Sequence, residues 1–166
     1  MATEKTQLVR DLMHVGVTTC GADTPFIEAV RTLVRENLES MIVLDEHGHS
    51  AGLFSRREAV AAYGQAGASI HGHAMLTVAD VMRPDIPELP PDIPATVAAQ
   101  MMLDYGVREI HLMHHASGMG WPAAVLRFDD ILRYLTAETE KETADMGAGA
   151  TRKTPVDVFK ERYSIK

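Results

Sequence analysis

Eight histidines and one cysteine are the side chains that could ligate a transition metal in this chain. The histidines that lie close together in the sequence are His47 with His49, His71 with His73, and the group His111, His114 and His115. The first two pairs flank a glycine in expected loops, and on a strand His111 and His114 would face opposite sides. Cys20 has no second thiol to complete a zinc site. We therefore expect the loop histidines to lie at the surface, and we expect no metal site.

Nucleophilic catalysis has equally little support. Cys20 has no histidine beside it in the sequence and is expected to be a small packing residue. The chain contains no Gly-x-Ser-x-Gly elbow. The glycine-rich stretch 147–154 carries Arg152 where a phosphate-binding loop needs its second glycine, so it is interpreted as a hinge. These observations favour a protein that is not an enzyme.

Two expected helix starts carry a carboxylate three residues after a polar side chain. Ser55 and Glu58 form the pattern of a capping box, in which each side chain satisfies a backbone donor of the other. Arg127 and Asp130 have the same spacing. A cation at a helix start opposes the helix dipole, and it is better tolerated where an anion binds beside it. For Ser55 and Glu58, capping and ligand binding both stay open. For Arg127 and Asp130 the alternatives to ligand binding are a surface arginine and compensation of the helix dipole.

Length and charge exclude several classes of protein. The 166 residues allow one ordinary domain or two very small ones, and 46% hydrophobic residues indicate a globular fold. No apolar run is long enough to span a bilayer, and the first residues lack the layout of a signal peptide. Residues 1–137 hold 10 basic and 17 acidic side chains, so the body carries the whole net charge of −7. We expect a soluble, cytoplasmic protein that binds neither nucleic acid nor membrane.

The body is a tandem repeat. Residues 9–13 (VRDLM) match residues 78–82 (VADVM), and residues 23–25 (DTP) match residues 92–94 (DIP) in the same register. The second copy then carries about three extra residues within 114–120. Each copy predicts a strand, a helix, two strands and a helix. Pro25 and Pro94 are predicted as first helical residues, with Asp23 and Asp92 as caps.

The repeated segments resemble a pair of CBS domains, the tandem arrangement called a Bateman module. The lead-in at 9–13 and 78–82, the hairpin at 45–52 and the segment 52–58 (GLFSRRE) carry this resemblance. It implies an α/β (α+β) fold of two βαββα repeats packed with pseudo-twofold symmetry, followed by a C-terminal helical tail. The boundaries that follow are 8–64 for the first domain, 65–76 for a linker, 77–137 for the second domain, and 138–166 for the tail.

The resemblance also implies a function. Such pairs often hold AMP, ADP, ATP or S-adenosylmethionine in clefts between the repeats, form homodimers, and regulate a partner protein through dimer rearrangement. No cofactor is required. A final carboxylate typically binds the ribose, a hydroxyl lies near it, and the first strand meets the adenine. A ligand-free interaction module with degenerate clefts is the alternative.

In the first copy the resemblance assigns the ligand to Thr18, Thr19, Ser55, Arg56 and Glu58. Glu39 precedes the middle strand where a cation would contact phosphate, so a nucleoside or a cationic adenosyl ligand is favoured there, unless Arg56 points into the cleft.

In the second copy the assigned residues are Asp85, Ile86, Arg108, His111, Arg127 and Asp130. Arg108, Arg127 and Asp130 together predict the better site for a phosphorylated nucleotide, and His111 would make binding pH-dependent. Ala124 and Arg127 replace the family's glycine and hydroxyl, which favours the alternative of a degenerate cleft.

The tail carries an apolar stripe of Val156, Phe159 and Tyr163 at helical spacing. The segment is too short to hold a helix alone. We interpret it as a dimer arm or a docking element, with a loose tail as the alternative.

Overall fold

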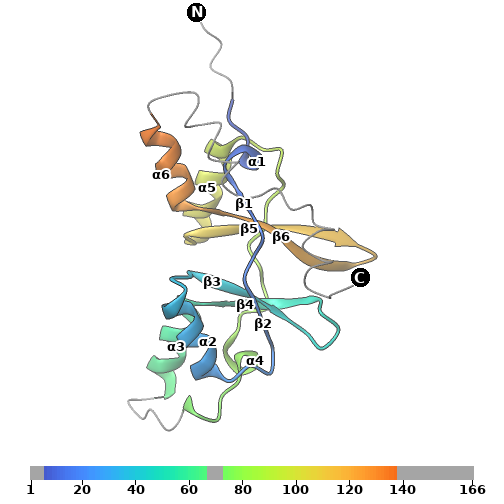
Figure 1. The fold of residues 1–166 in the computed structure, drawn as a ribbon, viewed down its shortest axis with the longest axis vertical. Helices are drawn as coiled ribbons and strands as arrows, with labels where there is room; N and C mark the ends of the chain where they lie inside the picture. Colours follow the sequence, from blue (N-terminus) through green and yellow to red (C-terminus); the bar gives the residue numbers. More distant parts are fainter. Residues whose placement is uncertain (1–5, 67–72, 138–166) are drawn as a thin grey trace, which may run out of the picture. The chain divides into compact units, whose positions relative to one another are not determined.

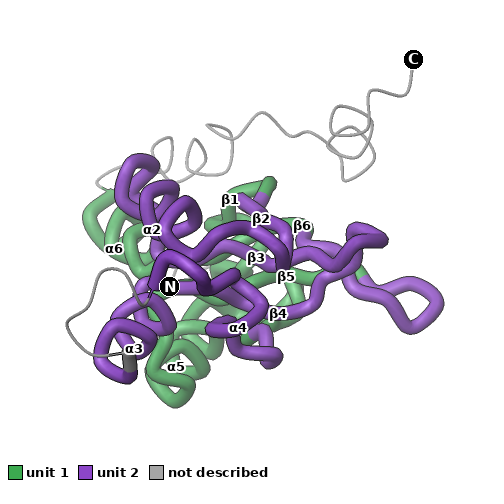
Figure 2. Tube along the Cα trace, turned by 90° about the horizontal axis from the view of Figure 1, so that it is seen from below, with its two compact units in different colours: residues 1–16, 87–114, 123–166 green, residues 17–86, 115–122 purple. Residues whose placement is uncertain are grey.

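The computed structural model describes residues 6–66 and 73–137, and the predictions for the tail concern residues outside these ranges. The chain forms two compact units (Figure 2). Unit 1 takes the described residues within 1–16, 87–114 and 123–166, and unit 2 takes those within 17–86 and 115–122. Each unit therefore contains segments from both sequence repeats.

Unit 2 is built on a three-stranded sheet in the order β2-β3-β4. Its elements are β2 (Thr19–Gly21), α2 (Phe26–Arg35), β3 (Ser40–Leu44), β4 (Ser50–Ser55), α3 (Arg56–Ala66) and α4 (Val78–Val81). β2 runs parallel to β3, and β4 runs antiparallel to it. Helices α2 and α3 cover one face of this sheet (Figure 1). Met41 and Val43 of β3 and Phe54 of β4 face the helices and pack in one apolar cluster.

Unit 1 has the same arrangement of a three-stranded sheet and helices, but one of its strands comes from the start of the chain. Its elements are α1 (Val9–Leu12), β1 (His14–Val15), α5 (Ala95–Tyr105), β5 (Glu109–Ala116), β6 (Met119–Arg127) and α6 (Phe128–Thr136). The sheet order is β1-β6-β5, and β1 pairs antiparallel with β6. Ile110 and Leu112 of β5 face the helices and pack with Val9 and Leu12 of α1. The fold class and the pairing of two similar α/β repeats are thereby confirmed.

The short lead-in helices are exchanged between the repeats. α1 precedes the first repeat but packs in the core of unit 1, and α4 precedes the second repeat but packs in unit 2. The backbone nitrogen of Ala95 donates to the carbonyl of Gln7 at 2.8 Å, and that of Phe26 donates to the carbonyl of Leu76 at 2.9 Å. The first amide of each long helix is therefore satisfied by the lead-in of the other repeat.

These bonds explain why the predicted helix starts are wrong by one residue. Pro25 and Pro94 are the N-caps of α2 and α5 with extended backbone, and neither helix has a side-chain cap. Because a lead-in carbonyl already accepts from the first helical amide, the predicted caps Asp23 and Asp92 are not used in this way. Asp92 instead pairs with Arg10.

The second repeat also lacks the predicted first strand. Between residues 87 and 89 the structure has a single parallel bridge, from Glu88 to His111. Pro87, Pro90 and Pro91 lack the backbone N–H that a strand ladder needs. The strand that completes the sheet of unit 1 is β1, from the start of the chain.

The extra residues of the second copy lengthen its hairpin. Strand β5 ends at Ala116 and strand β6 begins at Met119. The two residues of the turn between them, Ser117 and Gly118, both have positive φ. Trp121 near this tip packs edge-to-face on His49 with ring centroids 5.9 Å apart. Of the helices described, none is long and apolar enough to cross a membrane.

Candidate functional site

Four residues with hydroxyl side chains, Thr18, Thr19, Ser40 and Ser55, lie at one edge of the unit 2 sheet. The parallel strands β2 and β3 begin at this edge, and β4 ends there. The Ile42 amide donates to the Thr18 carbonyl at 3.1 Å, Thr19 pairs with Ile42, and Ser40 pairs with Ser55. Helix α3 starts directly after Ser55 and carries Glu58 in its first turn.

The serines of this edge lie on the face of the sheet opposite the helices. Met41 and Phe54 pack under α2 and α3, and side chains alternate along a strand. Their neighbours Ser40 and Ser55 therefore point away from the helices. Ser40 is buried and Ser55 is half-buried.

Ser55 and Glu58 form the predicted capping box. The Ser55 amide donates to Oε2 of Glu58 at 3.1 Å, and the Ser55 hydroxyl donates to the same oxygen. The Arg57 amide donates to Oγ of Ser55 at 3.0 Å. Within the described part of the chain, Oε1 of Glu58 has no hydrogen-bond partner, so half of this carboxylate is available to a ligand.

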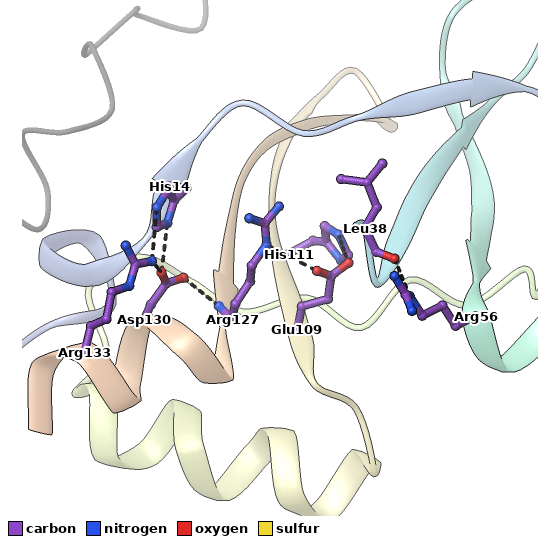
Figure 3. A network of polar contacts seen from close by, with 8 residues as sticks. All are labelled: His14, Leu38, Arg56, Glu109, His111, Arg127, Asp130 and Arg133. Carbon is purple, nitrogen blue, oxygen red and sulfur yellow. Dashed lines mark hydrogen bonds and ion pairs between the residues drawn. The ribbon is translucent and has the colours of Figure 1, made fainter. Parts of the chain in front are cut away.

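The Arg56 side chain points toward the carbonyl of Leu38 (Figure 3). Its Nε donates to the carbonyl of Leu38 at 2.7 Å, and its Nη2 donates to Oδ1 of Asn37 at 3.1 Å. Asn37 has a φ of 50°, and a guanidinium at a helix C-terminus binds carbonyls left without amide partners. The geometry therefore gives Arg56 a structural role.

The matching edge of unit 1 carries charged side chains in place of serines. By the register of the repeats, Glu109 corresponds to Ser40 and Arg127 to Ser55. The backbone follows the same plan, since the Phe128 amide donates to the Arg108 carbonyl at 3.0 Å, as the Arg56 amide donates to Glu39. Oε2 of the buried Glu109 lies 3.5 Å from Nε of Arg127.

Asp130, the counterpart of Glu58, is almost wholly occupied by protein groups (Figure 3). Its side chain is 1% exposed. Oδ2 accepts from the Arg127 amide at 2.9 Å. Oδ1 lies 3.0 Å from Nδ1 of His14 and also accepts from the Arg133 guanidinium. This carboxylate therefore joins the start of α6 to β1.

His111 is buried on the same sheet face as Glu109. Burial lowers the pKa of its imidazole to about 4, and the positive charge of Arg127 adds to this effect. Its Nε2 lies 3.7 Å from Oε1 of Glu109, and its Nδ1 is buried without a hydrogen-bond partner in the residues that the structure describes. His111 is consequently neutral at pH 7.

The predicted residues of the second copy are divided between the two units. Asp85 and Ile86 belong to unit 2, whereas Arg108, His111, Arg127 and Asp130 belong to unit 1. Thr18, Thr19, Ser55 and Glu58 all belong to unit 2. The residues assigned to the first copy thus share one compact unit, and those assigned to the second copy do not.

Three residues with a direct effect on the site were not anticipated from the sequence: His14, Glu109 and Arg133. The register of the repeats already placed Glu109 on Ser40, which was the available signal. His14 and Arg133 gave none, because their contact with Asp130 joins distant segments. Among the described residues, no three metal-ligating side chains gather. Burial raises the pKa of the Cys20 thiol to about 11, so this thiol is protonated at neutral pH.

The family model described as CBS domain matches residues 9–64 and again residues 78–137. No curated protein matches the sequence. A CBS-domain containing protein from Agrobacterium tumefaciens, ATU1752, is 21% identical with a TM-score of 0.66, over 80% of this chain and 96% of its own.

Two further similar structures contain ligands according to their descriptions. The CBS domain pair of protein MJ0100, in complex with 5-methylthioadenosine and S-adenosyl-L-methionine, is 19% identical with a TM-score of 0.64, over 78% of this chain and 99% of its own. CBSX2 in complex with AMP is 19% identical with a TM-score of 0.61, over 77% of this chain and 95% of its own.

Proposed function

This chain belongs to the CBS domain family, with two copies of the domain, and we propose that it is a non-catalytic regulatory module that binds an adenosine-type ligand. The ligand class is AMP, ADP, ATP or S-adenosylmethionine. Ligand binding would be passed to a partner protein through a change in the arrangement of a dimer. Such coupling requires that the ligand bind one arrangement more tightly than the other.

One observation carries the ligand-binding part of the proposal. Thr19, Ser40 and Ser55 lie at one edge of the unit 2 sheet, and Glu58 is hydrogen-bonded to Ser55. Hydroxyls and a carboxylate with a free oxygen are the groups that accept and donate hydrogen bonds to a ribose diol. The ligands of the MJ0100 domain pair and of CBSX2 support the same class.

Titration calorimetry of the full chain against AMP, ATP and S-adenosylmethionine tests the proposal. We expect micromolar binding of at least one of them. Glu58→Gln keeps the shape of the side chain and removes its charge, so it should weaken binding about tenfold, the effect of a lost charge-assisted hydrogen bond. Arg35→Gln, at the exposed end of α2, is the matched control and should leave affinity unchanged. If none of the three ligands binds to the folded protein, the proposal fails.

A ligand-free interaction module is the second candidate, and the state of Asp130 favours it. The carboxylate that a ribose would use in unit 1 is occupied by His14, Arg133 and the Arg127 amide. If the edge of unit 2 were inactive as well, the module would act only through protein contacts. The calorimetry above separates the two candidates.

We also propose that the protein acts as a homodimer. Exposed apolar side chains on the helices support this: Val34, Val60 and Tyr63 in unit 2, and Leu103, Leu132 and Leu135 in unit 1. Sedimentation at several concentrations tests it. A regulated protein partner and a location in the cytoplasm remain predictions from the sequence and the family.

A further inference from the structure

The following inference rests on the proposed function and concerns which half of the molecule performs it. We propose that unit 1 closes its own ligand edge with two groups of ion pairs, so that the chain binds one adenosine-type ligand, at Ser55 and Glu58 of unit 2. The two groups are Glu109 with Arg127, and Asp130 with His14 and Arg133.

The first step concerns space and charge at the strand ends. In unit 2 the cross-strand pair is Ser40 and Ser55, two short side chains. In unit 1 the corresponding side chains are Glu109 and Arg127, which meet at 3.5 Å on the same face of the sheet. Two long side chains joined across the strands thus occupy the positions that two short serines take in unit 2. Their charges also cancel, so the pair offers a phosphate no net attraction.

The second step concerns the carboxylate itself. A carboxylate has about four acceptor positions, and in Asp130 two accept hydrogen bonds from the Arg127 amide and the Arg133 guanidinium, while Nδ1 of His14 lies 3.0 Å from Oδ1. A ribose diol would have to displace a buried ion pair, which leaves charges unpaired in the interior. Glu58 has no cation partner among the described residues, and both of its protein hydrogen bonds go to Oε2. A ligand therefore meets a free oxygen in unit 2 and none in unit 1.

The third step explains why the closure persists. His14 belongs to β1, which is held beside β6 through the pairs His14–Val125 and Val15–Ala124. Arg133 reaches Asp130 from one turn further along α6. Both partners of Asp130 are thus supplied by regular elements of the same unit. His111 is neutral at pH 7 and adds no positive charge that would favour a phosphate.

The closing experiment measures stoichiometry and location on the unaltered protein. Calorimetry with whichever of AMP, ATP or S-adenosylmethionine binds should give one ligand per chain. Amide chemical-shift mapping by NMR should show the largest changes at Ser55 and Glu58, and small ones at Arg127 and Asp130. Two ligands per chain, or the largest shifts at Asp130, would overturn the inference and leave the proposed function intact.

Substitutions at Glu58 and Asp130 test separately which unit binds the ligand. Glu58→Gln should weaken binding about tenfold, whereas Asp130→Asn should change affinity less than about twofold while lowering the melting temperature. The opposite order of affinities would overturn the inference.

Glu109→Ser combined with Arg127→Ser recreates the unit 2 pair without touching the contacts of Asp130, and should leave the first binding event unchanged. Absence of binding in every protein would instead refute the proposed function itself.

Discussion

At the scale of single residues, His111 shows how burial decides protonation. The imidazole is 1% exposed and lies near Arg127, so both its surroundings and its charged neighbour disfavour the imidazolium form. Its counterpart in the other repeat is Ile42, an apolar residue that is also fully buried. A histidine in this position makes the folded state sensitive to acid.

The predicted effect has a definite sign. The folded pKa of about 4 lies below the unfolded value of 6.5, so the unfolded chain binds more protons between these values. The resulting stability is present above pH 6.5 and is lost as the pH falls toward 4. The full loss is of the order of 3 kcal/mol. Urea unfolding of wild type and His111→Ile across pH 4 to 7 measures it.

In the His111→Ile variant the free energy of unfolding should fall less steeply over this range. The other titratable groups are common to both proteins, so the difference between the two slopes isolates His111. Equal slopes would show that folding does not lower the pKa of His111, and would contradict the prediction.

At the scale of elements, a close backbone contact leaves no room for a side chain at one position of β4. A Cβ added at Gly52 would lie 2.5 Å from the carbonyl oxygen of Arg83, whose backbone exchanges two hydrogen bonds with Leu53. The oxygen belongs to the backbone, so it cannot move aside as a flexible side chain would. The corresponding residue of unit 1 is Ala124, which pairs with Val15 of β1. The two repeats therefore differ in how closely the neighbouring segment approaches.

Gly52→Ala is expected to destabilise the protein by about 2 kcal/mol, because the new methyl group must push the segment at Arg83 away from β4. Urea denaturation followed by circular dichroism measures the change. Ala124→Gly is the matched variant, and it should cost about 1 kcal/mol through backbone entropy and lost packing. A loss for Gly52→Ala no larger than this would mean that the close approach relaxes freely.

At the scale of the whole molecule, the exchange of lead-ins makes each unit depend on both repeats. Val9 and Leu12 are buried in the core of unit 1, although they precede the first repeat. Val78 is buried in unit 2, although it precedes the second repeat. A break between residues 66 and 73 would therefore leave each half without part of its own core.

Fragments 1–72 and 73–166 test this dependence. Neither fragment alone should show a cooperative thermal transition, because each lacks the lead-in that fills its core and satisfies the first amide of its long helix. Mixing the two should restore a cooperative transition and one species that elutes with the intact chain in size-exclusion chromatography. Independent cooperative folding of either fragment would contradict the role given to the lead-ins.

Much of the architecture follows from local patterns. The repeat, the helical spacing of Phe26, Ala29 and Leu33, and the short apolar runs predicted the main helices and hairpins, because periodicity reports which face of an element is buried. The Ser55–Glu58 capping box was also predictable, since its partners lie three residues apart on one helix turn. These features depend only on neighbours in the chain.

Contacts between distant segments decided the rest. Glu109 meets Arg127 across two strands, and Asp130 meets His14 from the other end of the chain. No spacing in the sequence encodes these pairs, because they depend on how β1 aligns with β6 and on which lead-in fills which core. The local sequence patterns thus predicted two similar carboxylates, Glu58 and Asp130, as ligand-binding groups. Tertiary packing supplied counter-charges to Asp130 alone and left an oxygen of Glu58 free to accept a hydrogen bond.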